Sequence, residues 1–535
     1  MEQENLLVHS SARPAVRLPA WLKKLSFFDI ILILFPVALL LKGPSDPDLG
    51  WHLRVGQDIW RGIFPFQDIY SWSMPGYAWV DHEWLANALM ALAYRLGGPI
   101  GLSIPYMFLG FGGYLLAVRT GALISRHLPD GRPLASMAGW RLGLGLMTIG
   151  LIVNNEIIGM RAQVVTLFGF ALAVYLLWSY LLGERRNAWL LVPLFWVWAN
   201  MHAGFVIGLL TLGMTLGLLA LAHLVPALQK LFPFDALQPA DYGRVFRHLA
   251  LVLGASVLAT LANPYTWRVY EEALRASLDQ YARASITEWM SVNFQSSIGL
   301  LIGAFTFLML WWLLWSRRFH SAWHMLLLPV FLYLGMTSVR NTTLLVIFLL
   351  PWLYAALAGH AGLRDFLEKS VDRAFGFRAG NWLYYAYNFT LALAPLALFA
   401  FTATTWLNST LHFDDVAQRI GYPARAVDFL HARGGGQNEV LLNDYNWGGY
   451  LIWRLPEYKV YTDGRMASWR GDKHILKEYS RIVDLSPDWL ALFKADHITL
   501  TLMPSKSRLS NVLHQMPGFR PIYSDDVATI FQYTP

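Results

Sequence analysis

The residues that could do chemistry gather where apolar segments end. Asp46 and Asp48 directly follow the first long apolar run, and Asp81, His82 and Glu83 lie farther along the same connecting segment. A charge near the hydrocarbon edge of a bilayer costs free energy, so carboxylates placed there tend to mark chemistry or transport. A carboxylate in such a place can serve as a general base or bind a hard divalent cation.

The composition indicates which kind of scaffold positions these groups. The chain has 535 residues, of which 56% are hydrophobic and 14% charged, whereas soluble domains carry about 25% charged residues. It contains 24 Trp, 31 Phe and 24 Tyr, which fits aromatic belts at the two membrane interfaces. We therefore predict a polytopic α-helical membrane protein.

Charge and cysteine content exclude two other classes. The formal net charge is +7, but the basic residues are spread over many connections, which does not favour a nucleic-acid partner. The chain has no Cys, so it can form neither a disulfide framework nor a thiolate metal site.

The apolar runs predict about eleven membrane spans, each of roughly 20 residues. The first run ends without a small-residue cleavage pattern, so we interpret it as a retained span rather than a signal peptide. The predicted spans are 27–43, 100–124, 141–156, 162–183, 188–201, 203–226, 247–262, 297–316, 323–338, 342–360 and 384–405.

Lys and Arg recur in alternate connections, which predicts the orientation because cytoplasmic loops are enriched in them. This pattern makes 1–26 a cytoplasmic segment, 27–405 a transmembrane domain with a large external loop at 44–99, and 406–535 an external domain. Within that loop, the stretches 51–61 and 82–97 are expected to be interfacial helices. A bacterial inner membrane, with the C-terminal domain in the periplasm, is the expected location.

The same topology places polar residues from distant loops at one membrane face. Convergent polar groups in an apolar setting are typical of a binding site. The candidates are Asp46, Asp48, His52, Asp81, His82, Glu83, Glu156, Arg161, His202, Glu288 and Arg340.

Structural roles are open for several of these residues. Asp46 and Asp81 are each suited to cap the helix that follows. Glu156 and Arg161 could form a salt bridge with each other, and His202 could be a satisfied histidine at a turn between spans. Arg340 fits either snorkelling to the interface or binding of an anionic head group.

From about residue 406 charges and turn residues return, and helices alternate with strands, which predicts a small α/β domain. Strands are expected at 439–443, 459–463, 496–503 and 519–533. The first two would place Asp444, Tyr445 and Trp447, and then Asp463 and Arg465, at one sheet edge, where ligands often bind. Turn formation is the alternative explanation of both segments.

Two features resemble a known superfamily. Asp46-Pro-Asp48 after the first span, the long first external loop and Glu156 in the second external loop are similar to the GT-C membrane glycosyltransferases. The segment from Tyr445 to Tyr450, followed by Asp463-Gly464-Arg465, resembles the Trp-Trp-Asp-Tyr-Gly region of oligosaccharyltransferase catalytic subunits, although no Trp-Trp-Asp is present.

The resemblance implies an activity and roles. GT-C enzymes move a sugar or glycan from a polyprenyl-phosphate or polyprenyl-pyrophosphate carrier to a protein, lipid or glycan acceptor. Asp48, with Asp46 as second choice, is then expected to be the base that activates or orients the acceptor. Arg340, with Arg161 second, is expected to bind the leaving phosphate, and Asp48 with Glu156 could hold Mg²⁺ or Mn²⁺.

The remaining candidates fall into two groups under this hypothesis. His82, Glu83 and His202 would orient the donor sugar or carrier, and the C-terminal domain would cover the site. Three alternatives stay open: a transporter or flippase for a lipid-linked or anionic solute, a non-catalytic membrane assembly protein, and a ligase that transfers a whole glycan.

Overall fold

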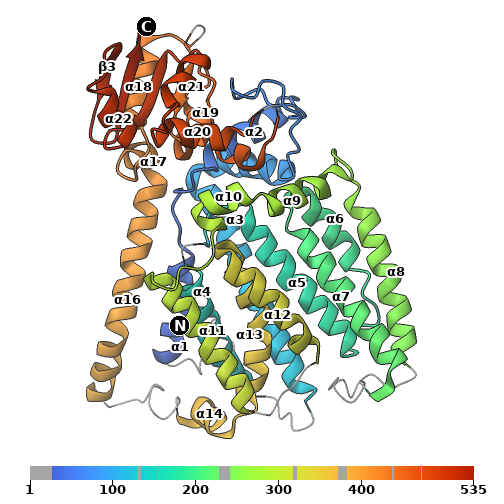
Figure 1. Cartoon of the computed structure of the whole chain (residues 1–535). Helices are drawn as coiled ribbons and strands as arrows, with labels where there is room; N and C mark the ends of the chain where they lie inside the picture. Colours follow the sequence, from blue (N-terminus) through green and yellow to red (C-terminus); the bar gives the residue numbers. More distant parts are fainter. Residues whose placement is uncertain are drawn as a thin grey trace, which may run out of the picture.

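The computed structural model describes residues 27–128, 134–155, 157–227, 241–316, 322–370, 382–436, 439–471 and 473–534. Figure 1 shows long helices packed side by side, with a mixed domain that contains the C-terminus at one end of the bundle. Short helices, including α2 (Leu49–Trp60), α9 (Arg268–Leu278) and α10 (Gln280–Ser285), lie at the end of the bundle where this domain is found. A largely helical bundle and a small C-terminal domain with a sheet are thus both present.

Each predicted apolar segment overlaps one long helix of the bundle. These are α1 (Phe27–Leu40), α3 (Trp84–Arg126), α4 (Ser136–Val153), α5 (Gln163–Leu181), α6 (Leu191–Met201), α7 (Phe205–Leu224), α8 (Tyr242–Thr260), α11 (Ser297–Ser316), α12 (Ala322–Thr337), α13 (Thr342–Ala358) and α16 (Trp382–Leu411). Within the described residues, five helices are long and apolar enough to cross a bilayer. The membrane character of the chain is therefore supported, whereas the count of about eleven spans stays a prediction.

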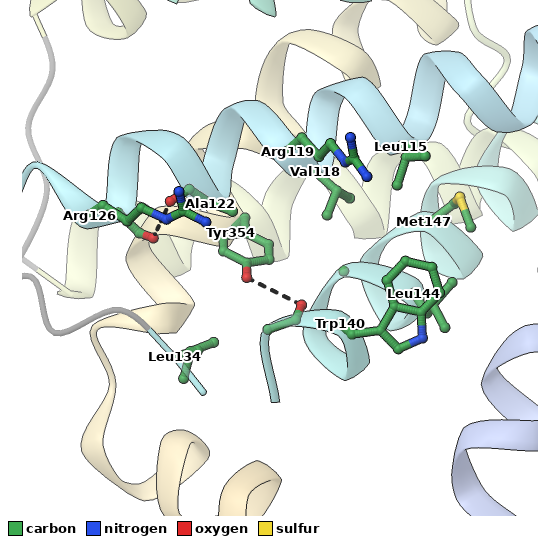
Figure 2. A pocket seen from close by; sticks show the side chains of 13 residues that line it. Leu115, Val118, Arg119, Ala122, Arg126, Leu134, Trp140, Leu144, Met147 and Tyr354 are labelled. Atoms are coloured by element: carbon green, nitrogen blue, oxygen red, sulfur yellow. Dashed lines mark hydrogen bonds between the residues drawn. The ribbon is translucent and has the colours of Figure 1, made fainter. Parts of the chain in front are cut away.

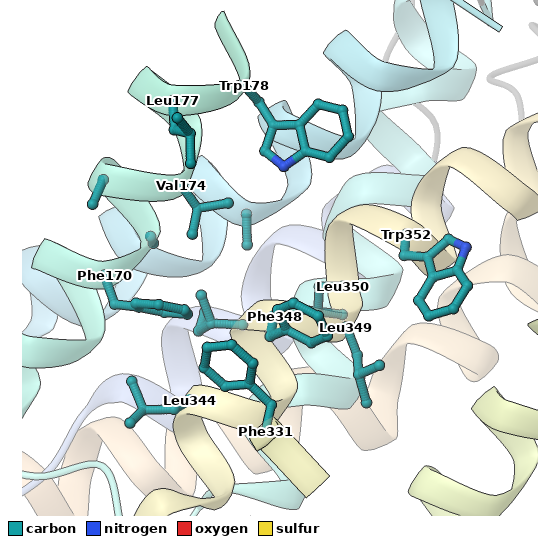
Figure 3. Packing of buried hydrophobic residues seen from close by; sticks show 14 of the residues in the cluster. Phe170, Val174, Leu177, Trp178, Phe331, Leu344, Phe348, Leu349, Leu350 and Trp352 are labelled. Atoms are coloured by element: carbon teal, nitrogen blue, oxygen red, sulfur yellow. The ribbon is translucent and has the colours of Figure 1, made fainter. Parts of the chain in front are cut away.

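The core of the bundle lies around α13, nearly all of whose residues are buried. Phe348 of α13 stacks on Phe331 of α12 with a centroid distance of 4.3 Å, and Phe170 of α5 packs on Phe331 at 5.2 Å (Figure 3). Between helices in lipid, this kind of close van der Waals packing drives association. It holds the ends of α5, α12 and α13 in a defined arrangement.

The first loop contains the two predicted interfacial helices. The first is α2 (Leu49–Trp60), and the second forms the beginning of α3. The helical geometry of α3 is broken at Gly97 and Gly98, where Gly98 has φ +56° and ψ −149°. This conformation is open only to glycine, so the glycine pair separates the loop helix from the longer apolar part of α3.

The C-terminal domain has a four-stranded sheet with strand order β1-β2-β4-β3. β1 (Leu441–Asn443) is parallel to β2 (Leu500–Pro504), while β4 (Ala528–Tyr533) is antiparallel to both β2 and β3 (Phe519–Ser524). The helices of this region are α17 (Phe413–Ala417), α18 (Ala424–Arg433), α19 (Gly448–Arg454), α20 (Ile475–Val483), α21 (Trp489–Ala495) and α22 (Arg508–Leu513).

The predicted strand at 459–463 is wrong. Val460 forms an isolated parallel bridge with Ser71 instead of joining the sheet. Its N–H donates to the carbonyl of Tyr70, and its carbonyl accepts from the N–H of Trp72, both at 3.1 Å. The alternating apolar residues of this segment pack against the first loop. The same alternation is typical of a strand in a sheet, so the sequence pattern does not separate the two cases.

Candidate functional site

A group of charged side chains joins three distant loops. Arg161, between α4 and α5, forms ion pairs with Asp46 through Nε and with Glu288 through Nη1. Glu288 lies in the short helix η4 (Thr287–Trp289). Asp46 also accepts a 2.8 Å hydrogen bond from the backbone N–H of Asp48. Arg161 thus carries positive charge directly beside the acidic end of the first loop.

Asp48 lies at the contact between the first loop and the C-terminal domain. It occupies the N-cap position of α2, yet its side chain makes no capping hydrogen bond. Its Oδ1 instead accepts a 2.9 Å bond from Nε1 of Trp51. Gly464 approaches so closely that a Cβ there would stand 1.8 Å from Oδ1 of Asp48. A carboxylate that caps nothing and sits in such a confined place is available for another role.

The surroundings of Asp48 favour its neutral form. Burial raises its pKa to about 7, and the negative charges of Asp46 and Asp463 add to the rise. Burial also raises the pKa of Tyr445 well above its usual value, with further contributions from Asp48, Asp463 and Glu288. A pKa near neutral pH suits a general base, which must be unprotonated when it takes the proton.

A second polar group lies at the start of α3. Nδ2 of Asn87 donates to both carboxylate oxygens of Asp81, at 3.1 and 2.9 Å, while Oδ1 of Asn87 lies 2.5 Å from Nδ1 of His52. Burial raises the pKa of Asp81 to about 7 and lowers that of His52 to about 4. Asp81 does not cap α3, because the N-cap residue is Glu83, whose N–H donates to Asp81 at 3.1 Å.

A chain of hydrogen bonds fixes the orientation of His202 beside Glu83. Nε1 of Trp198 donates to Oγ1 of Thr166 at 3.1 Å, and this hydroxyl lies 2.7 Å from Nδ1 of His202. Nδ1 also accepts from the N–H of Gly204 at 3.1 Å, so neutral His202 carries its proton on Nε2. Nε2 lies 3.4 Å from Oε1 of Glu83. The expectation of a satisfied histidine is met, and the second ring nitrogen faces the acidic cluster.

Two more histidines lie near Glu83. Nδ1 of His52 is 3.9 Å from Oε2, and Nε2 of His82 is 3.7 Å from Oε1. Burial raises the pKa of Glu83 well above its usual value, with additions from Asp81 and Asp48. Burial also lowers the pKa of His82 to about 4. The negative charge of Asp48 therefore raises the pKa of Glu83, although Asp48 precedes α2 and Glu83 precedes α3.

The positive charge of Arg340 acts on both Glu83 and His82. Arg340 lies in η5 (Val339–Asn341), at the start of α13, with its guanidinium carbon 5.3 Å from the ring centroid of Trp289. Its charge opposes the rise in the pKa of Glu83 and contributes to the low pKa of His82. Among the described residues, no carboxylate lies within 4 Å of this guanidinium, in contrast to Arg161.

Asp463 and Arg465 link the C-terminal domain to the first loop. Arg465 donates to both carboxylate oxygens of Asp463, at 2.8 and 2.7 Å, and to Oδ1 of Asp68 at 2.9 Å. Its guanidinium also lies over the rings of Tyr70 and Trp79. These contacts give Arg465 a structural role, because its charge is already neutralised and enclosed.

The residues predicted after the first strand, Asp444, Tyr445 and Trp447, do not share one role. Oδ1 of Asp444 accepts from the N–H of Asn446 at 2.9 Å, which caps η7 (Tyr445–Trp447). Nε1 of Trp447 donates to the carbonyl of Gly421 at 2.9 Å, inside the domain. The turn explanation thus accounts for Asp444, while Tyr445 is the member of this segment whose side chain senses the charge of Asp48.

The structure thus places most of the predicted polar loop residues close enough together that their charges influence one another. Sequence reasoning missed Asn87 and Thr166, which orient His52 and His202. Asn87 is an amide within a largely apolar helical stretch, so its isolation was a usable signal, whereas Thr166 had none. The connected predicted residues are Asp46, Asp48, His52, Asp81, His82, Glu83, Arg161, His202, Glu288, Arg340 and Tyr445.

Glu156 lies outside the described residues, so its predicted catalytic and metal-binding roles stay predictions. Of the proposed metal pair, the described structure contains only Asp48. Within the described residues, no group of three or more His, Asp or Glu side chains is arranged to hold a metal ion. The donors in the described residues alone do not form a Mg²⁺ or Mn²⁺ site.

The sequence matches no protein-family model and no curated protein. The structure is similar to that of the archaeal oligosaccharyltransferase AglB from Archaeoglobus fulgidus in complex with an inhibitory peptide and a dolichol-phosphate. Its TM-score is 0.52 at 11% identity, and the match covers 95% of this chain and 74% of AglB. The chain has the GT-C fold.

Two other solved structures are similar to this chain to different degrees. AglB tethered to an acceptor peptide containing the NVT sequon matches with a TM-score of 0.50 at 12% identity, covering 95% of this chain and 74% of AglB. ArnT from Cupriavidus metallidurans bound to undecaprenyl phosphate matches at 0.46 and 14% identity, covering 94% and 97%. The two AglB matches thus confirm the predicted GT-C fold, and a small C-terminal sheet domain is attached to it.

Proposed function

We propose that the chain is a membrane glycosyltransferase that moves a sugar or glycan from a polyprenyl-phosphate or polyprenyl-pyrophosphate carrier to an acceptor at the external membrane face. The observation that carries this proposal is the environment of Asp48. In a GT-C fold, this carboxyl lies in the first loop, has a pKa of about 7 and makes no capping bond. Dolichol-phosphate bound to the similar AglB structure is consistent with a lipid-linked donor.

The proposed reaction is a single displacement. The acceptor oxygen or nitrogen attacks the anomeric carbon. As it does so, the carboxylate of Asp48 takes the proton from that hydroxyl or amide. The new bond forms opposite the carrier, the bond between the anomeric carbon and the phosphate oxygen breaks, and the carrier leaves with both electrons. The sugar configuration is inverted.

Arg340 is the proposed partner of the departing phosphate. Its planar guanidinium matches phosphate oxygens, and the described structure gives it an aromatic ring rather than a carboxylate as its neighbour. Arg161, the second choice, is held by Asp46 and Glu288. Its charge opposes the rise that burial causes in the pKa of Asp46, while burial raises the pKa of Asp48 to about 7.

Glu83 and His202 are proposed to orient the donor sugar. The hydrogen-bond chain through Thr166 fixes the tautomer of His202, so Nε2 and Glu83 present a defined donor and acceptor pair. Sugar hydroxyls need both kinds of partner. Tyr445 would then cover the site from the C-terminal domain.

The proposed location follows from the positive-inside pattern. The N-terminus would be cytoplasmic, and the acidic site and C-terminal domain would face the periplasm of a bacterial inner membrane. A lipid-linked donor must be reached from the bilayer, which explains a site at the ends of membrane helices.

The test uses purified full-length protein and a panel of radiolabelled undecaprenyl-phosphate hexoses and undecaprenyl-pyrophosphate oligosaccharides. Release of free carrier that depends on added peptide, lipid or glycan acceptor supports the enzyme, and the accepted donor separates single-sugar transfer from glycan ligation. Uptake of a donor into vesicles without release supports the transporter instead. Neither activity with any donor supports the assembly protein.

The matched controls are two carboxylate variants. Asp48→Asn is expected to slow release by about 10²–10⁴-fold, whereas Glu271→Gln, at an exposed position on α9 (Arg268–Leu278), is expected to retain it. Full activity of Asp48→Asn would remove Asp48 from the mechanism.

A further inference from the structure

A cavity lies between three helices at the end of the bundle away from the acidic site. It has a volume of about 290 Å³ and is bounded by α3, α4 and α13. Tyr354 of α13 lines the cavity. It follows Arg340 by 14 positions, so the cavity lies roughly 21 Å along the helix from Arg340. This cavity is therefore separate from the proposed catalytic region.

The cavity combines an apolar wall with two arginines. Arg119 and Arg126 lie seven residues apart on α3, so they fall on nearly the same face of that helix. Figure 2 shows their side chains on one helix, with Trp140, Leu144 and Met147 of α4 across the cavity. The remaining lining residues include Leu115, Val118, Ala122, Leu134 and Tyr354.

Both guanidinium groups lack a counter-ion in the part of the chain that the structure describes. No carboxylate there lies within 4 Å of either one, and both side chains are exposed. Arg119 lies about 10 Å inside the helix end marked by Arg126, on a helix apolar enough to span the bilayer. An arginine at such depth needs a partner, since leaving it unpaired in hydrocarbon is costly.

Other polar groups at the cavity do not supply that partner. The hydroxyl of Tyr354 donates to the carbonyl of Gly139 at 3.2 Å, and Oγ of Ser125 donates to the carbonyl of Ala122 at 2.8 Å (Figure 2). Both hydroxyls are neutral, so neither balances the charge of an arginine. What the cavity presents to a ligand is two cations beside an apolar, aromatic-lined hollow.

We propose that this cavity binds an anionic phospholipid, with its phosphate between Arg119 and Arg126 and part of an acyl chain against Leu144 and Met147. Basic pockets between membrane helices on the cytoplasmic side are suited to anionic head groups. Lys and Arg are concentrated at this end by the predicted topology, so the lipid would come from the cytoplasmic leaflet. The inference does not rest on the proposed glycosyl transfer.

The test measures lipid binding to the purified full-length protein in neutral detergent by native mass spectrometry. Dioleoylphosphatidylglycerol is expected to bind about tenfold or more tightly than dioleoylphosphatidylcholine, because only the former has net negative charge. Equal binding of the two lipids overturns the proposal, and this comparison requires no variant.

Variants then locate the site. The double variant Arg119→Gln/Arg126→Gln is expected to lose the preference for phosphatidylglycerol. Arg185→Gln/Arg186→Gln, a pair of exposed arginines after α5 at the same end of the bundle, is expected to keep it. An unchanged preference in the first variant, or its loss in the second alone, overturns the assignment.

A third arm separates a lipid from free phosphate. Leu115→Trp, which places an indole in the cavity, is expected to weaken phosphatidylglycerol binding. Inorganic phosphate at millimolar concentration is expected to compete poorly, since it gains nothing from the apolar wall. Competition by inorganic phosphate with no effect of Leu115→Trp would instead identify a free-anion site and overturn the lipid proposal.

Discussion

At the scale of single residues, the proposal depends on the carboxyl group of Asp48. It is confined by Gly464, bonded to Trp51 and close to the charges of Asp46 and Asp463. Its protonation is therefore set by neighbours from both the first loop and the C-terminal domain.

Activity should follow the ionisation of Asp48. Because the base must be unprotonated, transfer is expected to rise with pH to a plateau above about 7, and Asp48→Asn is expected to lose about 10²–10⁴-fold in rate. The measurement is the pH–rate profile of carrier release. A profile without a rising limb in the neutral range would argue against Asp48 as the base.

Stability should respond to the same group. The folded pKa of about 7 lies above the ordinary value of 3.8, so the folded state binds the proton more tightly than the unfolded state does. The stabilisation is complete below about pH 4 and is lost as pH rises through about 7.

Asp48→Asn lacks this titration, so its melting temperature relative to wild type should increase between pH 5 and pH 8. Melting curves of both proteins at several pH values provide the measurement, and a difference independent of pH would contradict the raised pKa. Glu271→Gln serves again as the control, since its exposed carboxyl should leave the relative melting temperature unchanged.

At the scale of elements, close backbone contacts hold the C-terminal domain against the first loop. A Cβ on Gly50 of α2 would lie 2.2 Å from the carbonyl oxygen of Gly449 in α19, and Gly464 presses on Asp48 in the same way. The hydroxyl of Tyr422 donates to the carbonyl of Asp46 at 2.8 Å. The position of Asp48 is therefore set jointly by α2, α19 and η8 (Gly464–Ser468).

Gly464→Ala should disturb the site through space alone. The added methyl group must displace the carboxylate of Asp48, which is expected to cost about 1–3 kcal/mol of stability and most of the activity. Gly471→Ala is the control, because its Cβ would meet only the flexible end of Met74 at 3.2 Å. Melting temperature and carrier release measure both effects, and equal behaviour of the two variants would contradict the contact.

At the scale of the whole molecule, the first loop and the C-terminal domain form one unit. Ser71 pairs with Val460, Nε1 of Trp72 donates to the carbonyl of Leu441 at 2.8 Å, and Arg465 joins Asp68 to Asp463. This unit sits at the ends of the membrane helices, as Figure 1 shows.

Arg465→Met should weaken this unit. It leaves Asp68 and Asp463 buried without their cation, and loss of one partner from a buried pair typically costs about 3–5 kcal/mol. Arg425→Met is the control, since its pair with Asp526 is exposed at 3.6 Å and is expected to contribute at most about 1 kcal/mol.

Limited proteolysis and melting curves test this difference between the two arginines. Arg465→Met should be cleaved faster within the first loop, at 61–69, whereas Arg425→Met should behave like wild type. Equal protease resistance of both variants would show that Arg465 does not join the loop to the domain.

The amino-acid sequence by itself indicated a membrane scaffold and the positions of its long helices, and it predicts the membrane face at which the acidic residues gather. Hydropathy is a sum over about 20 local residues, and the bias of Lys and Arg sums over whole loops, so neither needs the tertiary fold. The first loop also carried the resemblance that led to the GT-C fold.

Only the tertiary structure decided the partners of these residues. Arg161 pairs with Asp46 and Glu288, Arg465 is occupied by Asp68 and Asp463, and the segment around Val460 joins the first loop rather than the sheet. The physical reason is range: an ion pair or a backbone bridge depends on separations of a few ångströms between segments that lie up to about 400 residues apart in the chain, and local patterns contain no information on such distances.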